Sequence, residues 1–310
     1  MPAWLSDNLI TIVDGVAFGV LLFTIAVGLS LVFGIMDVLN LAHGALYLVG
    51  AYVAVRFARG GQAGIGAFLL AGLAAVAVGA AAGAGLAVLT RPLARRGHLD
   101  QALLTLGVAL IIGDLLSARF GNDVQSVPPP AFLAGSVSLV GHDYPSYRLA
   151  VIIAGLALAV LVWLLVERSR AGALVRATVA DAPMVRALGV DTGRLVVAVF
   201  AFGVVLACLG GVLGAPFLGA YPGLDERVLI LGLVVVVLGG LGSVSGAFLG
   251  ALVIGQVEVL GVSLLPQYAS FLVFGTMAVV LLLRPTGMLG RAGGVRGTAR
   301  GVPRRAGKPG

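Results

Sequence analysis

The chain has 310 residues, of which 60% are hydrophobic and only 11% are charged, and its mean hydropathy is +1.11. Soluble domains carry about 25% charged residues, so this composition excludes an ordinary soluble domain and indicates an integral membrane protein. The net charge of +7 comes from separate clusters of arginines and forms no patch that suits nucleic acid. We therefore expect no nucleic-acid partner.

Long apolar stretches without charge follow one another along the chain. A helix needs ~20 apolar residues to cross ~30 Å of hydrocarbon, and the blocks rich in Leu, Val, Ala and Gly lack the alternation of a membrane barrel. We predict an all-α integral membrane protein, a polytopic helical bundle of about eight or nine membrane segments, some of them broken or re-entrant. The expected segments are 9–33, 41–57, 64–90, 102–118, 149–166, 195–214, two helices within 228–263, and 269–283.

Arginine placement predicts which ends of these segments lie inside the cell. Basic clusters occur at 91–96, at 168–194 and in the tail from 284 onward, whereas residues 1–14 contain no Lys or Arg. The positive-inside rule then puts the clusters in the cytoplasm and the N-terminus outside. Because no basic leader precedes the first span, we expect no cleaved signal peptide. The predicted parts are a permease domain over 1–290, with an outside loop at 119–148 and a cytoplasmic loop at 167–194, and a basic disordered tail over 291–310.

Two regions combine polar residues or glycines with apolar surroundings. Residues 34–59 contain Asp37, Asn40 and His43, and residues 239–246 read "GGLGSVSG". Polar groups and irregular backbone at membrane depth must be satisfied by neighbouring helices or must line a cavity. The sequence leaves open whether they line a transport pathway or cap broken helices.

Glu258 is the one acid well inside a late apolar segment. Intramembrane ionisable residues are costly and are candidates for function, so Glu258 is a candidate pathway residue, with helix packing as the alternative. Gln256 is expected to solvate its carboxylate.

Several kinds of chemistry have no support in the sequence. It contains no GxxxxGK[ST] phosphate loop and no HExxH zinc motif, and His43, His98 and His142 fall in three different segments. Cys208, the single cysteine, cannot form a disulfide within the chain. We therefore expect no catalytic, metal or cofactor site in this chain, and any ATP hydrolysis must occur on another chain.

The stretch "DAPMVRALG" (181–189) has the signals of a short isolated helix. Asp181 is an N-cap residue, Pro183 is tolerated in the first turn, and Gly189 suits a left-handed C-terminal position. Such a helix is too short to be stable alone. Met184, Val185 and Leu188 form an apolar stripe, which predicts either a docking contact with another chain or packing onto the membrane domain.

Three stretches of the sequence resemble one family of permeases. The segment "AGALVRATVADAPMVRALGVDTGRL" (171–195) resembles the cytoplasmic loop of ABC importer permeases, without the Ile-x-Leu-Pro ending of the broader pattern. Residues 28–54, with Asn40, Ala42, His43 and Gly44, resemble the N-terminal signature of LivH-type permeases. "VLGGLGSVSGAFLGALVIGQVE" (237–258) and "LLLRPTGMLG" (281–290) resemble the C-terminal signature of that family.

The resemblance implies a transmembrane subunit of an ABC importer for branched-chain amino acids in the bacterial or archaeal cytoplasmic membrane. Its implied partners are a second homologous permease, two cytoplasmic ATPase subunits carrying ATP-Mg, an extracytoplasmic binding protein and membrane lipid. The implied coupling residues are Asp181, Pro183, Met184, Val185, Leu188 and Gly189, and the candidate pathway residues are Asn40, His43, Gly44 and Glu258. The alternatives are the same kind of permease for urea, short amides or another small polar solute, and an ATP-independent carrier or channel.

Overall fold

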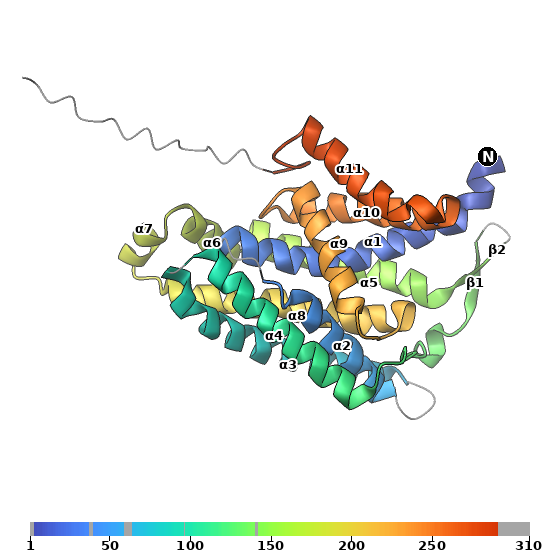
Figure 1. Ribbon diagram of the computed structural model, residues 1–310, viewed down its shortest axis with the longest axis horizontal. Coiled ribbons are helices and arrows are strands. Elements are labelled where there is room, and N and C mark those ends of the chain that lie inside the picture. The colour runs from blue at the N-terminus through green and yellow to red at the C-terminus, as the bar shows by residue number, and fades with distance from the viewer. Residues whose placement is uncertain (1–2, 37–39, 59–63, 96, 140–141, 291–310) are drawn as a thin grey trace, which may run out of the picture.

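The computed structural model describes residues 3–36, 40–58, 64–95, 97–139 and 142–290 (Figure 1). The larger helices are α1 (Ala3–Met36), α2 (His43–Ala58), α3 (Ile65–Thr90), α4 (His98–Phe120), α5 (Ser146–Trp163), α8 (Thr192–Leu218), α9 (Leu224–Gly239), α10 (Val244–Leu264) and α11 (Ala269–Leu283). The smaller elements are η1 (Arg91–Arg95), η2 (Ala131–Leu133), the hairpin β1 (Ser136–Leu139) and β2 (His142–Pro145), η3 (Leu164–Arg168), α6 (Arg170–Ala180), α7 (Ala182–Ala187) and η4 (Pro266–Tyr268).

Seven helices of the described chain are long and apolar enough to cross a membrane. The other two large helices, α2 and α9, have 16 residues each, or about 24 Å at 1.5 Å per residue, which falls short of ~30 Å of hydrocarbon. The structure thus confirms a polytopic helical bundle of about nine segments. Both short helices adjoin a predicted break, since α2 begins at His43 and α9 ends at Gly239.

The helix α1 lies along the middle of the bundle (Figure 1). In the span Asn8–Gly34, 89% of the most apolar window is buried, against 11% in α4 and 17% in the spans of α3 and α5. The outer helices expose many leucines, such as Leu73 on α3 and Leu115 on α4. These apolar surfaces suit contact with lipid, while α1, α2 and α8 supply much of the interior core.

The two ends of the bundle carry different elements. The N-terminus and the β1–β2 hairpin lie at one end, and α6 and α7 lie at the other (Figure 1). Arg168, Arg170 and Arg176 belong to the second end. The positive-inside rule predicts that this end is cytoplasmic and that the hairpin end is extracytoplasmic. The tail over 291–310 and Asp37 lie outside the described residues.

A polar contact fastens the hairpin to the bundle. The hydroxyl of Tyr144 on β2 donates to Oδ1 of Asp14 on α1 at 2.7 Å, and Nη1 of Arg148 on α5 donates to Oδ2 of the same carboxylate at 2.5 Å. Burial of the hydroxyl, together with the hydrogen bond and the negative charge of Asp14, raises the pKa of Tyr144 above its usual value of 10.0. The hairpin is therefore held in place by α1 and α5.

The predicted membrane segments end at 214 and resume at 228, but the structure leaves a shorter gap between helices. The helix α8 continues through Pro216 to Leu218, and α9 begins at Leu224. Leu224 and Val228 at the start of α9 are buried, so this part of the chain packs inside the bundle. The remaining residues 219–223 are fixed to the long extracytoplasmic loop by a pair of backbone hydrogen bonds between Gln125 and Ala220, of 2.8 and 2.9 Å.

The two parts of the C-terminal signature pack against each other. The backbone N–H groups of Met288 and Leu289 donate to the carbonyls of Leu238 and Gly239, at 2.8 and 3.1 Å. These bonds satisfy carbonyls at the end of α9 that the helix itself leaves unpaired. The segment after α11 therefore closes the break between α9 and α10.

Candidate functional site

The short helix α7 has the ends that the sequence predicts. Oδ1 of Asp181 accepts the Met184 N–H at 2.9 Å, so Asp181 is the N-cap, and Pro183 stands in the first turn. Gly189 follows the helix with φ +84°, a left-handed conformation that a side chain disfavours. Local sequence chemistry thus fixes both the start and the end of this element.

The predicted apolar stripe on α7 is only partly exposed. Met184 is 57% exposed and Leu188 is 72% exposed, whereas Val185 is 5% exposed. Val185 therefore packs against the chain itself, which is one of the two alternatives that the sequence left open. Of the predicted stripe, Met184 and Leu188 remain exposed.

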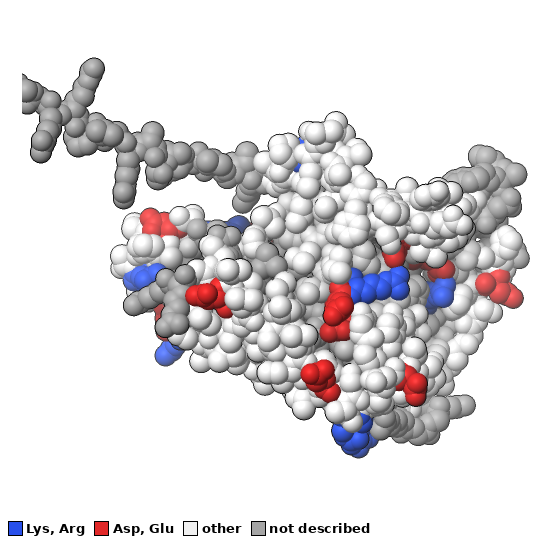
Figure 2. Space-filling view, viewed as in Figure 1, with Lys and Arg blue, Asp and Glu red and all other residues white. Residues whose placement is uncertain are grey.

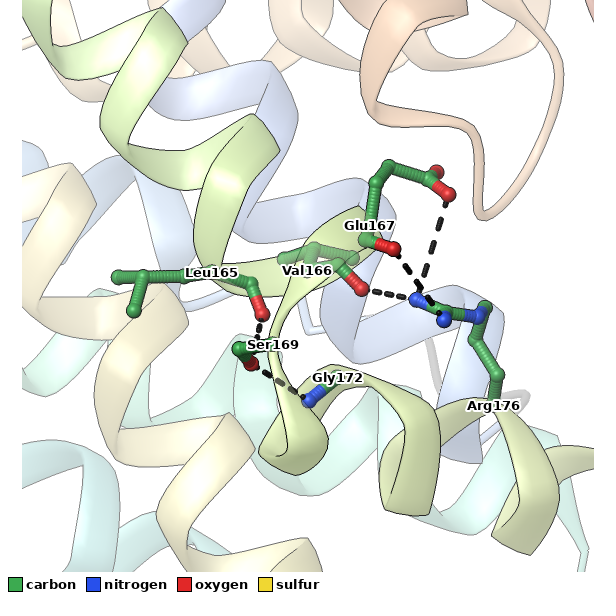
Figure 3. Close-up of polar contacts among 6 residues, drawn as sticks. All are labelled: Leu165, Val166, Glu167, Ser169, Gly172 and Arg176. Carbon is green, nitrogen blue, oxygen red and sulfur yellow. Dashed lines mark hydrogen bonds and ion pairs between the residues drawn. The ribbon is translucent and has the colours of Figure 1, made fainter.

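A polar junction joins α7 and α6 to the membrane domain (Figure 3). After α5 the chain forms the π-helical turn η3 and then reverses into α6. The guanidinium of Arg176 donates to the carbonyls of Val166 and Glu167 and lies 4.0 Å from the Glu167 carboxylate. The Ser169 hydroxyl donates to the Leu165 carbonyl and accepts the Gly172 N–H.

The junction leaves no room for a side chain at Gly172. A Cβ there would lie 2.1 Å from the Val166 carbonyl oxygen, well inside van der Waals contact. The side chain of Arg176 and the backbone of Gly172 therefore hold α6 closely against the end of α5.

At the other candidate site, Asn40 and Thr105 accept hydrogen bonds from backbone N–H groups in the break between α1 and α2. Oδ1 of Asn40 accepts the Ala42 N–H at 3.1 Å, and Oγ1 of Thr105 on α4 accepts the Leu41 N–H at 3.1 Å. Irregular backbone at membrane depth requires such partners. Asn40 therefore caps the start of α2, a role that the sequence left open beside pathway lining.

His43 is fully buried and lies against α1 and α8. A Cβ built at Gly28 would lie 2.9 Å from its Nε2, and the Gly203 carbonyl oxygen borders the same space. Within the described residues, both ring nitrogens, Nδ2 of Asn40 and Oε1 of Gln101 are buried without a hydrogen-bond partner. Sequence analysis missed Gln101 and Thr105, because their polar groups meet this region only through the packing of α4.

Gly44 allows α2 to approach α9. A Cβ at this position would lie 2.2 Å from the Asp225 carbonyl oxygen and 2.8 Å from Cβ of Leu229. The structure therefore brings Gly44 to the N-terminal turn of α9, where the charged residues Asp225, Glu226 and Arg227 follow one another.

Glu258 on α10 is paired with Arg227 on α9. Nη2 of Arg227 donates to Oε1 of Glu258 at 2.9 Å, and the Glu258 side chain is 13% exposed. Gln256, expected to solvate this carboxylate, instead donates to the Ile12 carbonyl at 2.8 Å. That prediction is wrong because residues two apart on a helix do not face each other. Figure 2 shows acidic and basic side chains gathered near the middle of this face, over α9.

The candidate residues thus form three groups. The residues of α7 lie at the cytoplasmic end, Asn40 and His43 lie inside the bundle, and Gly44 and Glu258 both border α9. Among the described residues, no three His, Cys, Asp or Glu side chains gather as metal ligands would.

Comparison with known proteins agrees with this architecture. Residues 11–281 match the family described as branched-chain amino acid transport system / permease component. The permease protein BraD of Pseudomonas aeruginosa is 30% identical over 291 residues, covering 90% of this chain and 95% of the relative. LivH of Escherichia coli is 30% identical over 301 residues (90% and 94%), and a probable LivH of Methanocaldococcus jannaschii is 25% identical over 289 residues (87% and 89%). No solved structure matches the chain.

The bundle of apolar helices and these relatives define a multi-pass permease of the cytoplasmic membrane, of the ABC type. Since the match covers most of its length, the chain belongs to the family of branched-chain amino acid transport system permeases. Its signature stretches are the ones that build the break before α2 and the closed turn after α9.

Proposed function

We propose that this chain is one transmembrane subunit of an ABC importer that takes up branched-chain amino acids, driven by ATP hydrolysis on partner subunits. The observation that carries the proposal is the capped helix α7, which exposes Met184 and Leu188 beyond the cytoplasmic end of the bundle. An exposed apolar pair on a short helix needs a partner surface. A cytoplasmic ATPase subunit supplies it.

The structure of the α5–α6 junction supports a mechanism for coupling. ATP-Mg, bound on the partner subunits, closes the ATPase pair and displaces α7. Arg176 and Gly172 transmit the displacement to α5, and the chain that follows Gly189 transmits it to α8. The permease then has two states, in which its substrate cavity opens to the cytoplasm or to the other side. The free-energy difference between these states depends on the state of the ATPases, and a population shift requires such a difference.

The proposed substrate follows from the names of the relatives. BraD and LivH are high-affinity branched-chain amino acid transport permeases, so leucine, isoleucine and valine are the proposed cargo. A binding protein delivers the amino acid to the end that bears the β1–β2 hairpin, and a second homologous permease completes the cavity. Urea and short amides are the alternative cargo.

Uptake by the assembled transporter tests the proposal. The chain is reconstituted in liposomes with its ATPases, second permease and binding protein, and uptake of labelled leucine, urea and acetamide is measured with and without ATP. We expect uptake of leucine that requires ATP and the ATPase subunits. Uptake of urea or acetamide without uptake of leucine would show that the proposed cargo is wrong. Uptake by this chain without the ATPases would show that it is an ATP-independent carrier.

A further inference from the structure

A groove between α2, α4 and α9 opens on the extracytoplasmic half of the bundle. Its volume is about 210 Å³, below the ~300–1,000 Å³ that drug-sized ligands occupy, so it suits a small solute. Apolar side chains of all three helices form much of its wall. The lining residues used below are Leu41, Leu48, Leu110, Leu229, Asp114, Ser117, Asp225 and Glu226.

Three carboxylates border the groove, and one of them lies well inside a membrane-spanning helix. Asp114 stands six residues before the end of α4 at Phe120, or about 9 Å inside it at 1.5 Å per residue. Asp225 and Glu226 belong to the first turn of α9. In the described chain, no Lys, Arg or His side chain forms an ion pair with any of the three.

The face that bears these unpaired carboxylates does not meet lipid, because a charged side chain in hydrocarbon is costly. The outer surfaces of α3 and α4 elsewhere are apolar, with residues such as Leu73 and Leu115 exposed. The face formed by α4 and the start of α9 therefore meets water or another protein subunit. A cavity shared with a second permease meets this condition.

The carboxylate of Asp225 is held in a defined orientation. Oδ1 accepts the Gly223 N–H at 3.1 Å, and Oδ2 lies 3.9 Å from the position that a Cβ at Gly113 would take. Since Gly113 belongs to α4, Oδ2 faces across the groove. One oxygen of Asp225 is thus used by the fold, and the other is available to a ligand.

A buried hydroxyl lies beside the groove. Tyr52 on α2 is 1% exposed, and its hydroxyl makes no hydrogen bond within the described residues. Its ring stacks on Phe120, with the centroids 4.5 Å apart. Leu48 and Ser117, one helical turn before Tyr52 and Phe120, line the groove. An unpaired buried hydroxyl is costly, so this one indicates a missing partner.

We propose that the groove between α2, α4 and α9 binds the ammonium group of the transported amino acid, with Asp225 as its principal partner and Tyr52 as a second acceptor. The leucines of the wall then receive the branched aliphatic side chain, since a small solute with one cationic end and one apolar end matches both parts of the lining. This inference rests on the proposed function for the identity of the solute.

Protection of a cysteine in the groove tests the proposal. The permease carrying Ser117→Cys is assembled with its partner subunits in lipid nanodiscs and labelled with a thiol reagent. Native Cys208 is fully buried and serves as an unreactive background. The competing solutes are L-leucine, 3-methylbutylamine, which lacks the carboxylate, and 4-methylpentanoate, which lacks the ammonium.

We expect leucine and the amine to slow labelling and the carboxylate to have no effect. Adding Asp225→Asn should weaken protection about tenfold or more, because a charged hydrogen bond is lost, while its amide oxygen still accepts the Gly223 N–H. Asp123→Asn, in the extracytoplasmic loop, is the matched control and should leave protection unchanged.

Tyr52→Phe separates binding from structure. Its hydroxyl has no hydrogen-bond partner in the part of the chain that the structure describes, so the variant should weaken protection several-fold without lowering the thermal unfolding midpoint of the complex. A lowered midpoint with unchanged protection would show a purely structural role and remove Tyr52 from the site.

The proposal is overturned if Ser117→Cys does not label, if no solute protects it, or if 4-methylpentanoate protects as well as leucine. Leucine uptake by the same preparation is measured in parallel. Normal leucine uptake without protection contradicts binding in the groove and leaves the proposed function unaffected. Protection by the amine without leucine uptake supports the groove and contradicts the proposed cargo.

Discussion

The absence of a side chain at Gly44 lets α2 and α9 touch, because a Cβ would lie 2.2 Å from the Asp225 carbonyl oxygen. Gly44→Ala should force the helices apart and destabilise the protein by about 1–3 kcal/mol, as overpacking does. The measurement is the thermal unfolding midpoint of the purified protein in detergent.

Gly85→Ala is the control for this substitution. Gly85 lies on α3, where a Cβ would meet nothing within 4 Å, and alanine favours the helix over glycine. This variant should unfold at the wild-type temperature or above it. Equal midpoints for the two variants would contradict the close contact between α2 and α9.

The raised pKa of Tyr144 predicts a loss of stability at high pH. Below its usual pKa of 10.0, the hydroxyl is neutral in both the folded and the unfolded chain, and its contribution is complete. Above pH 10 the unfolded chain releases the proton and the folded chain holds it, so unfolding is favoured increasingly as pH rises. Wild type should lose thermal stability between pH 10 and pH 11 more steeply than Tyr144→Phe, and equal pH dependence would contradict the hydrogen bond to Asp14.

Single residues were predictable where their chemistry is local. Asp181 and Gly189 were assigned correctly because a cap and a left-handed turn depend on neighbouring residues. The partner of Glu258 was missed because Arg227 stands 31 residues away and on a different helix. The sequence left the burial of Val185 open for the same reason, since that burial depends on tertiary contacts.

At the scale of elements, α7 requires its left-handed end. Gly189→Val places a β-branched side chain at φ +84°, which costs about 1–3 kcal/mol of strain, so α7 should lose its orientation. We expect membrane insertion to be unchanged and ATP-driven leucine uptake to fall about tenfold. Ala187→Val, within the helical turn, should retain most uptake, and normal uptake by Gly189→Val would count against docking through α7.

Elements were predictable from length and hydropathy, with one exception. The order of the segments and the breaks near 34–59 and 239–246 follow from the sequence, because glycines and polar residues interrupt apolar runs. The predicted segments leave residues 215–227 between two helices, although most of these residues are helical. The three consecutive charged residues Asp225, Glu226 and Arg227 interrupt the apolar pattern by which the sequence indicates a membrane helix. Leu224 and Val228 beside them are nevertheless buried.

For the whole molecule, the orientation in the membrane is a direct expectation. Asp123 lies in the loop at the hairpin end and Met184 on α7 at the other end. A membrane-impermeant thiol reagent should label Asp123→Cys in intact cells and Met184→Cys only after the membrane is opened. Labelling of both positions in intact cells would contradict the orientation, and the unsubstituted protein, with buried Cys208, provides the background.

The arrangement of the bundle was less predictable than its content. Hydropathy identifies the membrane segments but not that α2, with Tyr47 and Tyr52 fully buried, lies inside a layer of longer helices. The groove beside it depends on residues from three helices far apart in sequence. Only the packing of the whole chain brings Asp114 to the same groove as Asp225.

The central claim is that α7 couples ATP hydrolysis on the partner subunits to this permease. The rate of ATP hydrolysis by the complete complex in nanodiscs tests it most directly. The rate is measured with and without leucine-loaded binding protein for wild type, for the double variant Met184→Ser with Leu188→Ser, and for Leu99→Ser. Leu99 is as exposed as Leu188, at 72%, and begins α4 at the same end of the bundle. The account predicts that the loaded binding protein stimulates hydrolysis in wild type and Leu99→Ser and not in the double variant. Full stimulation in the double variant would contradict it.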